Sequence, residues 1–237
     1  MIDTLRHSAI YNPELYKDKH VAIIGAGTIG SHLALTLARM QVPITMYDND
    51  TIEAHNLATQ SYTRHDIGKK KVYAVKAQCD AIGTEMGMVE AVPELFTATP
   101  ADIIVSCVDS IEARKEIARA IIETDIVLDN WRPIHDGRIG GEQVEVYRYA
   151  NAKEWLDDLP EQADTDPCGA RFTAYTANIA AGLLANNIKR ELIGQSVQKR
   201  ILYDAVSSSY IKDRPATHAL DADDALDIAK RVNADER

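Results

Sequence analysis

Cysteine and aromatic residues are scarce in this chain, and long apolar runs are missing. Its 237 residues include 3 cysteines, 2 tryptophans and 2 phenylalanines, so we expect a largely aliphatic core. Cys79, Cys107 and Cys168 lie far apart, which argues against a disulfide framework and against a structural zinc site built from C-x-x-C pairs. No stretch approaches about 18 consecutive apolar residues, and the first residues lack the features of a secretory signal. We therefore expect a cytoplasmic protein with no membrane segment.

Acidic residues outnumber basic ones, with 36 Asp and Glu against 26 Lys and Arg and a net charge of −10. This balance argues against a nucleic-acid partner, because non-specific binding to a phosphate backbone needs a basic surface. It still allows a small anionic ligand at one local site. The length fits one α/β domain. We expect an N-terminal arm over residues 1–19, a folded domain over 20–214 and a charged tail over 215–237.

The clearest local pattern is a glycine turn between an apolar strand, residues 21–24, and a helix expected over residues 31–40. Gly25 would make the tight turn, Gly27 would let the backbone approach a phosphate, and Gly30 would let the helix pack closely on the strand. The N-terminus of the helix offers free N–H groups and a positive dipole end to an anion. The turn therefore predicts a phosphate site.

A second strand, expected over residues 43–47, ends on Asp48. Asp48 follows Gly30 by 48 − 30 = 18 positions. That offset is close to the roughly 20 residues expected for an acid that binds a ribose hydroxyl. The strand, turn, helix and acid together predict an adenine nucleotide, and the default interpretation of such a pattern is an NAD-dependent oxidoreductase.

Later residues point to a different nucleotide. Asp48 and Asp50 place two acids at one strand end, and three lysines at 69–71 open the next helix. Asp109 follows the apolar run at 102–108, at the edge where open α/β sheets bind ligands. Lysines beside phosphates and a lone carboxylate suit a magnesium triphosphate. Taken singly, Asp109 could be a helix N-cap and the lysines a solvated helix face.

Apolar periodicity and apolar runs predict the remaining elements. The expected helices cover residues 69–82, 111–123 and 173–192. The expected strands cover residues 87–92, 102–108, 125–131, 143–147, 200–206 and 210–211, and a surface loop is expected over 151–166. This order predicts an α/β fold. Its Rossmann-like mixed β-sheet, flanked by helices, would be parallel in the N-terminal half and antiparallel in the C-terminal half.

Five ordered motifs resemble those of the HesA/MoeB/ThiF family of ubiquitin-activating-enzyme-like adenylating enzymes. The family has a glycine turn GAGGLGS, a strand ending D-x-D, then N-L-x-R-Q, D-I-G-K-x-K and a strand ending in Asp. This chain carries the corresponding motifs, in the same order, at residues 25–31, 48–50, 56–60, 66–71 and 107–109. The resemblance covers about residues 21–214.

The resemblance implies a homodimer that uses ATP and Mg²⁺ to adenylate a C-terminal carboxylate, with release of pyrophosphate. The carboxylate would belong to a ubiquitin-like or sulfur-carrier protein, or to a peptide. The nucleotide-binding residues implied by position are Gly25, Gly27, Gly30, Asp48, Asp50, Asn56, Gln60 and Lys71. The two acids would hold the ribose, and Asn56, Gln60 and Lys71 would contact phosphates. Lys71 and Asp109 would be catalytic, with Asp109 binding Mg²⁺.

Two positions depart from the family pattern. Thr59 stands where the family has an arginine, and Ala9 replaces the second arginine of a family R-Y-S-R-Q segment, which reaches into the partner's site. Each change removes positive charge that would stabilise a transition state at phosphorus. Two further hypotheses therefore stay open: a nucleotide-binding, catalytically weak or inactive activating-enzyme-like subunit, and an NAD-dependent oxidoreductase.

The three cysteines have different expected roles. Cys168 precedes Gly169 and is a candidate nucleophile that could form a thioester or persulfide. An ordinary cysteine beside a glycine turn is the alternative. Cys107, inside an apolar strand, and Cys79, on a helix, are expected to be buried.

Overall fold

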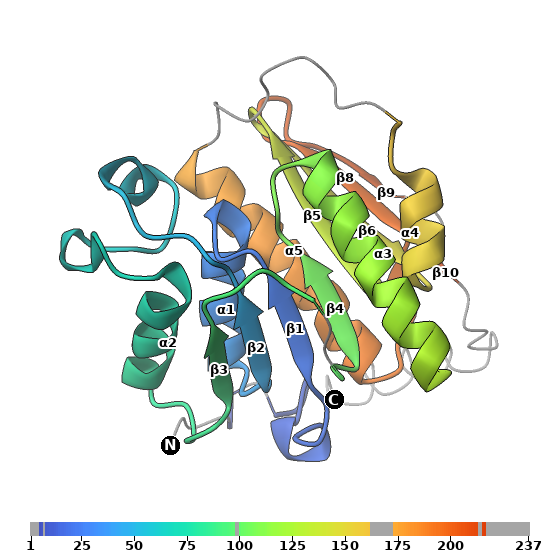
Figure 1. Ribbon diagram of the computed structural model, residues 1–237, viewed down its shortest axis with the longest axis horizontal. Helices are drawn as coiled ribbons and strands as arrows, with labels where there is room; N and C mark the ends of the chain where they lie inside the picture. Colours follow the sequence, from blue (N-terminus) through green and yellow to red (C-terminus); the bar gives the residue numbers. More distant parts are fainter. Residues whose placement is uncertain (1–4, 7, 98–99, 162–172, 213–214, 217–237) are drawn as a thin grey trace, which may run out of the picture.

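The computed structural model of the chain describes residues 5–6, 8–97, 100–161, 173–212 and 215–216. They form a mixed sheet with helices on both faces (Figure 1). The helices are α1 (Thr28–Arg39), α2 (Lys71–Ile82), α3 (Ile111–Leu128), α4 (Ala152–Asp158) and α5 (Ala174–Leu192). The strands are β1 (Val21–Ile24), β2 (Ile44–Tyr47), β3 (Val89–Val92), β4 (Ile103–Ser106), β5 (Ile134–Gly140), β6 (Gln143–Tyr149), β7 (Val197–Gln198), β8 (Arg200–Asp204), β9 (Ser209–Lys212) and β10 (Pro215–Ala216).

The main sheet has the strand order β3-β2-β1-β4-β5-β6-β8-β9. Strands β3 to β5 pair in parallel, and β6, β8 and β9 add antiparallel pairs. This is the predicted Rossmann-like mixed sheet, parallel in its N-terminal half and antiparallel in its C-terminal half. The chain leaves β1 toward β2 and β3, then returns to place β4 on the other side of β1. The gap between the carboxyl ends of β1 and β4 is therefore a topological switch point, where open α/β sheets bind ligands.

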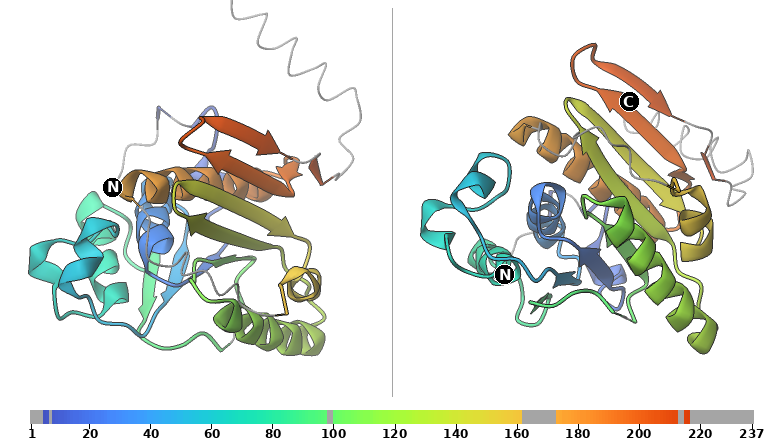
Figure 2. Two further views of the ribbon diagram at one scale, coloured as in Figure 1. Left: turned by 90° about the horizontal axis from the view of Figure 1, so that it is seen from above. Right: turned by 45° about the horizontal axis from the view of Figure 1, so that its top comes forward.

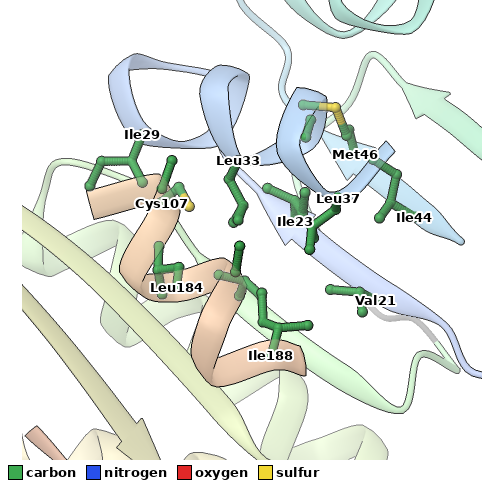
Figure 3. Close-up of a cluster of buried hydrophobic side chains, with 14 of the residues drawn as sticks. Val21, Ile23, Ile29, Leu33, Leu37, Ile44, Met46, Cys107, Leu184 and Ile188 are labelled. Carbon is green, nitrogen blue, oxygen red and sulfur yellow. The ribbon is translucent and has the colours of Figure 1, made fainter. Parts of the chain in front are cut away.

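Strand β1 is buried on both faces, as expected for a central parallel strand. Val21 and Ile23 pack toward α1 and α5, where they meet Leu33 and Leu184 (Figure 3). The alternate side chains of β1 face the second cluster, which includes Trp155. Helices α3 and α4 thus cover one face of the sheet and α1 and α5 the other (Figure 2).

A buried ionic group ties α5 to the sheet. Nε2 of His135 in β5 lies 3.5 Å from Oε2 of Glu191 in α5. Arg148 of β6 donates two hydrogen bonds to the same carboxylate, at 3.0 and 2.9 Å. Burial lowers the pKa of His135. Burial alone would raise the pKa of Glu191, but its contacts with His135 and Arg148 outweigh burial and lower that pKa to about 2.

The strand predicted over residues 125–131 is wrong, because α3 continues to Leu128. Asp129 ends the helix in a left-handed conformation, with φ of 48°. Asp125 stays inside the helix and forms a buried ion pair with Arg132. The apolar run Ile126-Val127-Leu128 lies exposed on the last turn of α3. The wrong prediction arose because a short apolar run is also typical of a buried strand. The next strand begins at Ile134.

The surface loop predicted over residues 151–166 is wrong over α4. Asn151 caps this helix by accepting a hydrogen bond from the Glu154 N–H at 2.9 Å. The Glu154 carboxylate returns to the Ala150 N–H at 2.7 Å, and Trp155 is fully buried against α3 and the sheet. An Asn followed three residues later by Glu is a helix-start signal, and the acidic composition obscured it.

Other predicted elements are confirmed with small shifts at their ends. The helix predicted over 173–192 is α5, with Thr173 as its N-cap. The hairpin predicted over 200–211 is β8 and β9. The predicted helices at 69–82 and 111–123 correspond to α2 and α3. None of the described helices combines the length and apolarity that a membrane crossing requires.

Candidate functional site

The glycine turn lies at the switch point between β1 and β4. Gly25 continues the β1 ladder through its N–H, which bonds to the Tyr47 carbonyl at 2.8 Å. Its φ of +95° strongly favours glycine. A Cβ atom there would also lie 2.9 Å from the Cys107 carbonyl oxygen, just after β4. The turn is therefore held closely against the loop that leads to Asp109.

Gly27 and Gly30 have opposite surroundings. Helix α1 begins at Thr28, earlier than predicted, so Gly30 lies in its first turn. A Cβ atom on Gly30 would lie 1.9 Å from the Gly25 carbonyl oxygen, which enforces glycine for packing. A Cβ atom on Gly27 would meet no atom within 4 Å. Gly27 is also the N-cap of α1 and supplies no side-chain cap. The space and the N-terminal N–H groups suit an anion.

Asp48 fixes the turn from β2. Its Oδ2 accepts a hydrogen bond from the Ala26 N–H at 2.7 Å, and its Oδ1 accepts one from the Asp50 N–H at 2.8 Å. Each oxygen can accept a second hydrogen bond, so the carboxylate can still bind a hydroxyl. Asp48 therefore connects the glycine turn to the segment that carries the next predicted site residues.

Lys71 is a buried cation at the start of α2. Its residue exposure is 7%, and its Nζ lies 2.7 Å from Oδ2 of Asp50, whose side chain is 61% exposed. The backbone joins the same two residues, because the Lys71 N–H donates to the Asp50 carbonyl at 3.1 Å. The neighbouring Lys69 points outward and pairs with Asp66. The structure thus separates Lys71 from the solvated lysines beside it.

The segment between Asp50 and α2 is bonded to the glycine turn and α1. Tyr62 donates from its hydroxyl to the Ala26 carbonyl at 2.5 Å, and the Ser61 N–H donates to Ser31 Oγ at 3.1 Å. The Oγ1 atoms of Thr59 and Thr28 lie 3.4 Å apart. Sequence analysis missed Tyr62, whose signal was an aromatic residue within a polar connection.

Asn56 and Gln60 differ in how well their amides are satisfied. Asn56 is buried, and its Oδ1 accepts a hydrogen bond from the Glu53 N–H at 2.8 Å, which caps a short 3₁₀ helix, Ala54–Ala58. Oε1 of Gln60 is buried and accepts no hydrogen bond from a described residue. An unsatisfied acceptor of this kind is uncommon in a folded protein. Gln60 therefore offers a polar contact at the edge of the turn.

Asp109 is exposed and lies three residues after the end of β4. The N-cap of α3 is Ser110, whose Oγ accepts a hydrogen bond from the Ala113 N–H at 3.0 Å. The N-cap interpretation of Asp109 is therefore wrong, and its carboxylate forms no hydrogen bond or ion pair with a described residue. A hard oxygen donor in this position fits Mg²⁺. The described residues contain no cluster of three potential metal ligands, so phosphate oxygens would have to complete the coordination.

The predicted burial of two cysteines is confirmed. Cys79 and Cys107 are buried free thiols. Burial raises the pKa of Cys79 to about 12 and raises that of Cys107 further. Burial of both side chains disfavours the thiolate form, which is the nucleophilic form of cysteine. Cys168 lies outside the described residues.

A second group of residues near β4 was also missed. Asp136 in β5 is fully buried and pairs across the sheet with Ser106, at the carboxyl end of β4. It forms ion pairs with Arg114 of α3 and with Arg138. The available signal was an Asp-Gly-Arg sequence in the stretch between the strands expected over 125–131 and 143–147.

The sequence of this chain is similar to those of known proteins. Ubiquitin-like modifier-activating enzyme 5 of Drosophila erecta is 28% identical over an alignment of 238 positions, which covers 87% of this chain and 58% of that protein. The chain thus spans little more than half the length of this relative.

Solved structures share the fold. PaaA superposes with a TM-score of 0.68 at 21% identity, covering 85% of this chain and 65% of PaaA. MccB of E. coli with ATP superposes with a TM-score of 0.65 at 21% identity, covering 89% of this chain and 68% of MccB. The ThiF family profile matches residues 14–220, which is most of the chain. By sequence and by fold, this chain belongs to the ThiF family.

Proposed function

We propose that this protein uses ATP to adenylate a carboxylate at the end of a protein or peptide chain. The observation that carries the proposal is the buried Lys71, whose ammonium group is held beside Asp50 at the glycine turn. A cation placed there suits a triphosphate, whereas nicotinamide chemistry has no need of it. Membership of the ThiF family supports the same function.

The binding mode follows from the positions of the side chains. The phosphates would lie over Gly27 and the N-terminus of α1, where the backbone leaves room. Asp48 would accept from the ribose, and Asp50 would lie beside it. Gln60 and Asn56 would complete the polar edge, with Gln60 as the more available contact because its Oε1 is unsatisfied. Lys71 would turn from Asp50 toward the phosphates.

The chemistry is a displacement at the α-phosphorus. A carboxylate oxygen of the substrate forms a bond to that phosphorus, and the bond from phosphorus to the oxygen bridging to the β-phosphate breaks. Pyrophosphate leaves with the electron pair, and an acyl-adenylate remains. The Lys71 ammonium stabilises negative charge that gathers on the phosphate oxygens. Bound at Asp109, Mg²⁺ would supply further charge neutralisation.

The substrate class comes from the relatives. The Drosophila relative is named for activating a ubiquitin-like modifier, and MccB is described with ATP bound. We propose a ubiquitin-like protein, a sulfur carrier or a peptide as the source of the carboxylate. We also propose a homodimer, for which sedimentation equilibrium would give twice the chain mass of 26.2 kDa. A single-chain mass at micromolar concentration would contradict it.

A second candidate function is a nucleotide-binding subunit with weak or no catalysis. Thr59 favours it, because this side chain contacts Thr28 and supplies no charge where the family has an arginine. Ala9 is exposed and likewise uncharged. The two candidates share the nucleotide site and differ in turnover.

Pyrophosphate exchange into ATP tests the proposal. The full chain would be mixed with ATP, Mg²⁺ and a ubiquitin-like or sulfur-carrier protein that ends in Gly-Gly. Exchange that needs the carrier, and that Lys71→Ala or Asp109→Ala abolishes, supports adenylation. Lys76→Ala is the matched control, since Lys76 lies on α2 in an exposed ion pair with Asp80. ATP binding without exchange with any carrier would favour the second candidate.

A further inference from the structure

Asp136 of β5 accepts hydrogen bonds from three donors beside the carboxyl end of β4. Its Oδ1 accepts from Arg114 Nε at 3.0 Å. Its Oδ2 accepts from Arg138 Nε at 2.9 Å and from the Trp155 indole at 3.1 Å. The Asp136 side chain is fully buried, whereas the exposures of Arg114 and Arg138 are 5% and 21%. One buried carboxylate therefore fixes two arginines in place.

The group carries more positive than negative charge. Asp136 can neutralise one of its two arginine partners, so one positive charge remains. A third arginine, Arg200 of β8, lies over the Tyr147 ring at 5.3 Å, while Arg138 lies over the same ring at 4.5 Å. The nearby acid Glu145 accepts a hydrogen bond from the Tyr147 hydroxyl. Glu145 lies directly opposite Arg138 in the register of β5 and β6, so the three arginines face two acids and one net positive charge remains.

Arg138 is the member of this group that can take a ligand. Its Nε donates to Asp136 Oδ2 at 2.9 Å, and its buried Nη2 forms an ion pair with the same oxygen at 2.7 Å, so this edge of the guanidinium is occupied. The Arg138 side chain is 21% exposed, so a ligand would have to approach the edge that faces away from Asp136. The Tyr147 ring and Asp136 hold the guanidinium on two sides, which presents its remaining edge in a fixed orientation.

The position of Arg138 connects it to the nucleotide turn. Gly137, the preceding residue, faces α5 and α1, because a Cβ atom on it would lie 2.8 Å from Leu184 Cδ1 and 3.4 Å from Ile29 Cδ1. Successive side chains of a strand point to opposite faces, so Arg138 points to the other face of the sheet. Asp136 pairs with Ser106, and Ser106 is followed by the loop that contacts Gly25 and leads to Asp109. Arg138 therefore lies beyond the carboxyl ends of the parallel strands, on the α3 side of the switch point. A carboxylate approaching the nucleotide from the antiparallel half of the sheet would meet it.

We propose that Arg138, oriented by Asp136 and Tyr147, binds the C-terminal carboxylate of the substrate chain before that carboxylate reacts. This inference rests on the proposed adenylation and names a specificity-determining residue for it. A planar guanidinium with donors left over matches a carboxylate in two-point geometry. Arg138 would also supply positive charge that Thr59 no longer provides.

The test follows the side chains directly by nuclear magnetic resonance. The full chain would carry ¹⁵N-labelled arginine and tryptophan, and the Nε–H signal of Arg138 would be assigned by its loss in Arg138→Lys. The Trp155 indole N–H, which donates to Asp136, is a second reporter that survives in every Arg138 variant. The probes are N-acetyl-glycylglycine, its C-terminal amide, N-acetyl-aspartyl-glycinamide and inorganic phosphate. ATP binding would be measured on the same samples by calorimetry.

The expected result is a saturable shift of both signals with N-acetyl-glycylglycine and about 10- to 100-fold weaker binding of both amides, the range expected for a hydrogen-bonded charge pair. Arg138→Gln should weaken carboxylate binding by the same factor at the Trp155 reporter. Arg138→Lys should restore part of it, and Arg39→Gln, on an exposed turn of α1, should change nothing.

Three results would overturn the inference. The first is no shift, or an equal shift with the neutral amide. The second is equal or stronger binding of N-acetyl-aspartyl-glycinamide, which would assign the site to an acidic side chain. The third is stronger binding of phosphate, which would assign it to the nucleotide. ATP binding is measured separately on the same samples. Carboxylate binding by a chain that does not bind ATP would contradict the proposed function but would leave the carboxylate site at Arg138 standing.

Discussion

The Nζ atom of Lys71 lies 2.7 Å from Oδ2 of Asp50, and these two residues come from opposite ends of the segment that narrows the choice of nucleotide. Lys71 is buried, while the Asp50 side chain is 61% exposed. Asp50 also donates from its N–H to Asp48, which accepts from the Ala26 N–H, so hydrogen bonds through Asp48 connect the pair to the glycine turn. A bound triphosphate would compete with Asp50 for the Lys71 ammonium group, so the pair should open when ATP binds.

Replacing Lys71 by Ala should reduce the rate of pyrophosphate exchange by roughly 10²- to 10³-fold, the usual loss when one preorganised electrostatic donor is removed. The fold should persist, because Asp50 is exposed and tolerates the loss of its partner. Exchange kinetics and a urea unfolding curve on the same preparation would measure both effects. Lys76→Ala should leave both unchanged, and an active Lys71→Ala enzyme would refute the site assignment.

Alanine at Gly30 and alanine at Gly27 should have opposite effects. Gly30→Ala would place a Cβ atom 1.9 Å from a backbone oxygen, so stability should fall by about 1–3 kcal/mol or more. Gly27→Ala meets open space and should cost at most about 1 kcal/mol as a poorer N-cap. It should nevertheless weaken ATP binding at least about tenfold, because the methyl group occupies the space proposed for a phosphate. Denaturant unfolding would measure the stability of both variants, and titration with ATP would measure their affinity. Tight ATP binding by Gly27→Ala would contradict the proposed phosphate site at the glycine turn.

The buried group around His135 should make the protein less stable in acid. The pKa of His135 is lowered in the fold from its ordinary value of 6.5, so the unfolded chain binds a proton first and stability falls as pH drops below 6.5. The Glu191 carboxylate, with its pKa lowered from 4.5 to about 2, adds a further loss between those values. Urea unfolding between pH 7.5 and 5.5 should show this slope. His135→Leu should flatten it, and an unchanged slope in that variant would contradict this assignment.

Thr59→Arg tests whether the missing family arginine limits catalysis. Thr59 lies beside Thr28 of the turn, so a longer cationic side chain there can reach a phosphate. Exchange should rise by about tenfold or more, the effect of about 1.4 kcal/mol of added transition-state stabilisation. Thr59→Gln, which adds length without charge, is the control. A rate that does not rise would mean that other cations, such as Arg138, already supply the charge.

The parallel half of the fold was predictable because its signals are local. The β1 run, the glycine turn and Asp48 occur in one short stretch, and the structure places them together as expected. Ser110 rather than Asp109 caps α3, and this choice depends on side-chain geometry that both residue types permit. The sequence thus predicted the positions of the turn and of Asp48 better than it predicted the cap of α3.

The antiparallel half was less predictable because burial there depends on distant partners. Ile126-Val127-Leu128 is apolar, yet it forms the exposed end of α3 because Asp125 bonds forward to Arg132. The Arg138–Asp136 contact joins residues two apart in β5, and Arg114 and Trp155 complete it from two helices. No local sequence pattern predicts such a group, because its members come together only when α3 and α4 pack on the sheet.

Calorimetric titration of the full chain with MgATP, and separately with NADH in the same buffer, tests the central claim most directly. The account predicts that MgATP binds with one site per chain, that Gly27→Ala weakens this binding at least about tenfold, and that NADH does not bind. Binding of NADH with no affinity for MgATP would contradict it and would restore the oxidoreductase interpretation of the glycine turn.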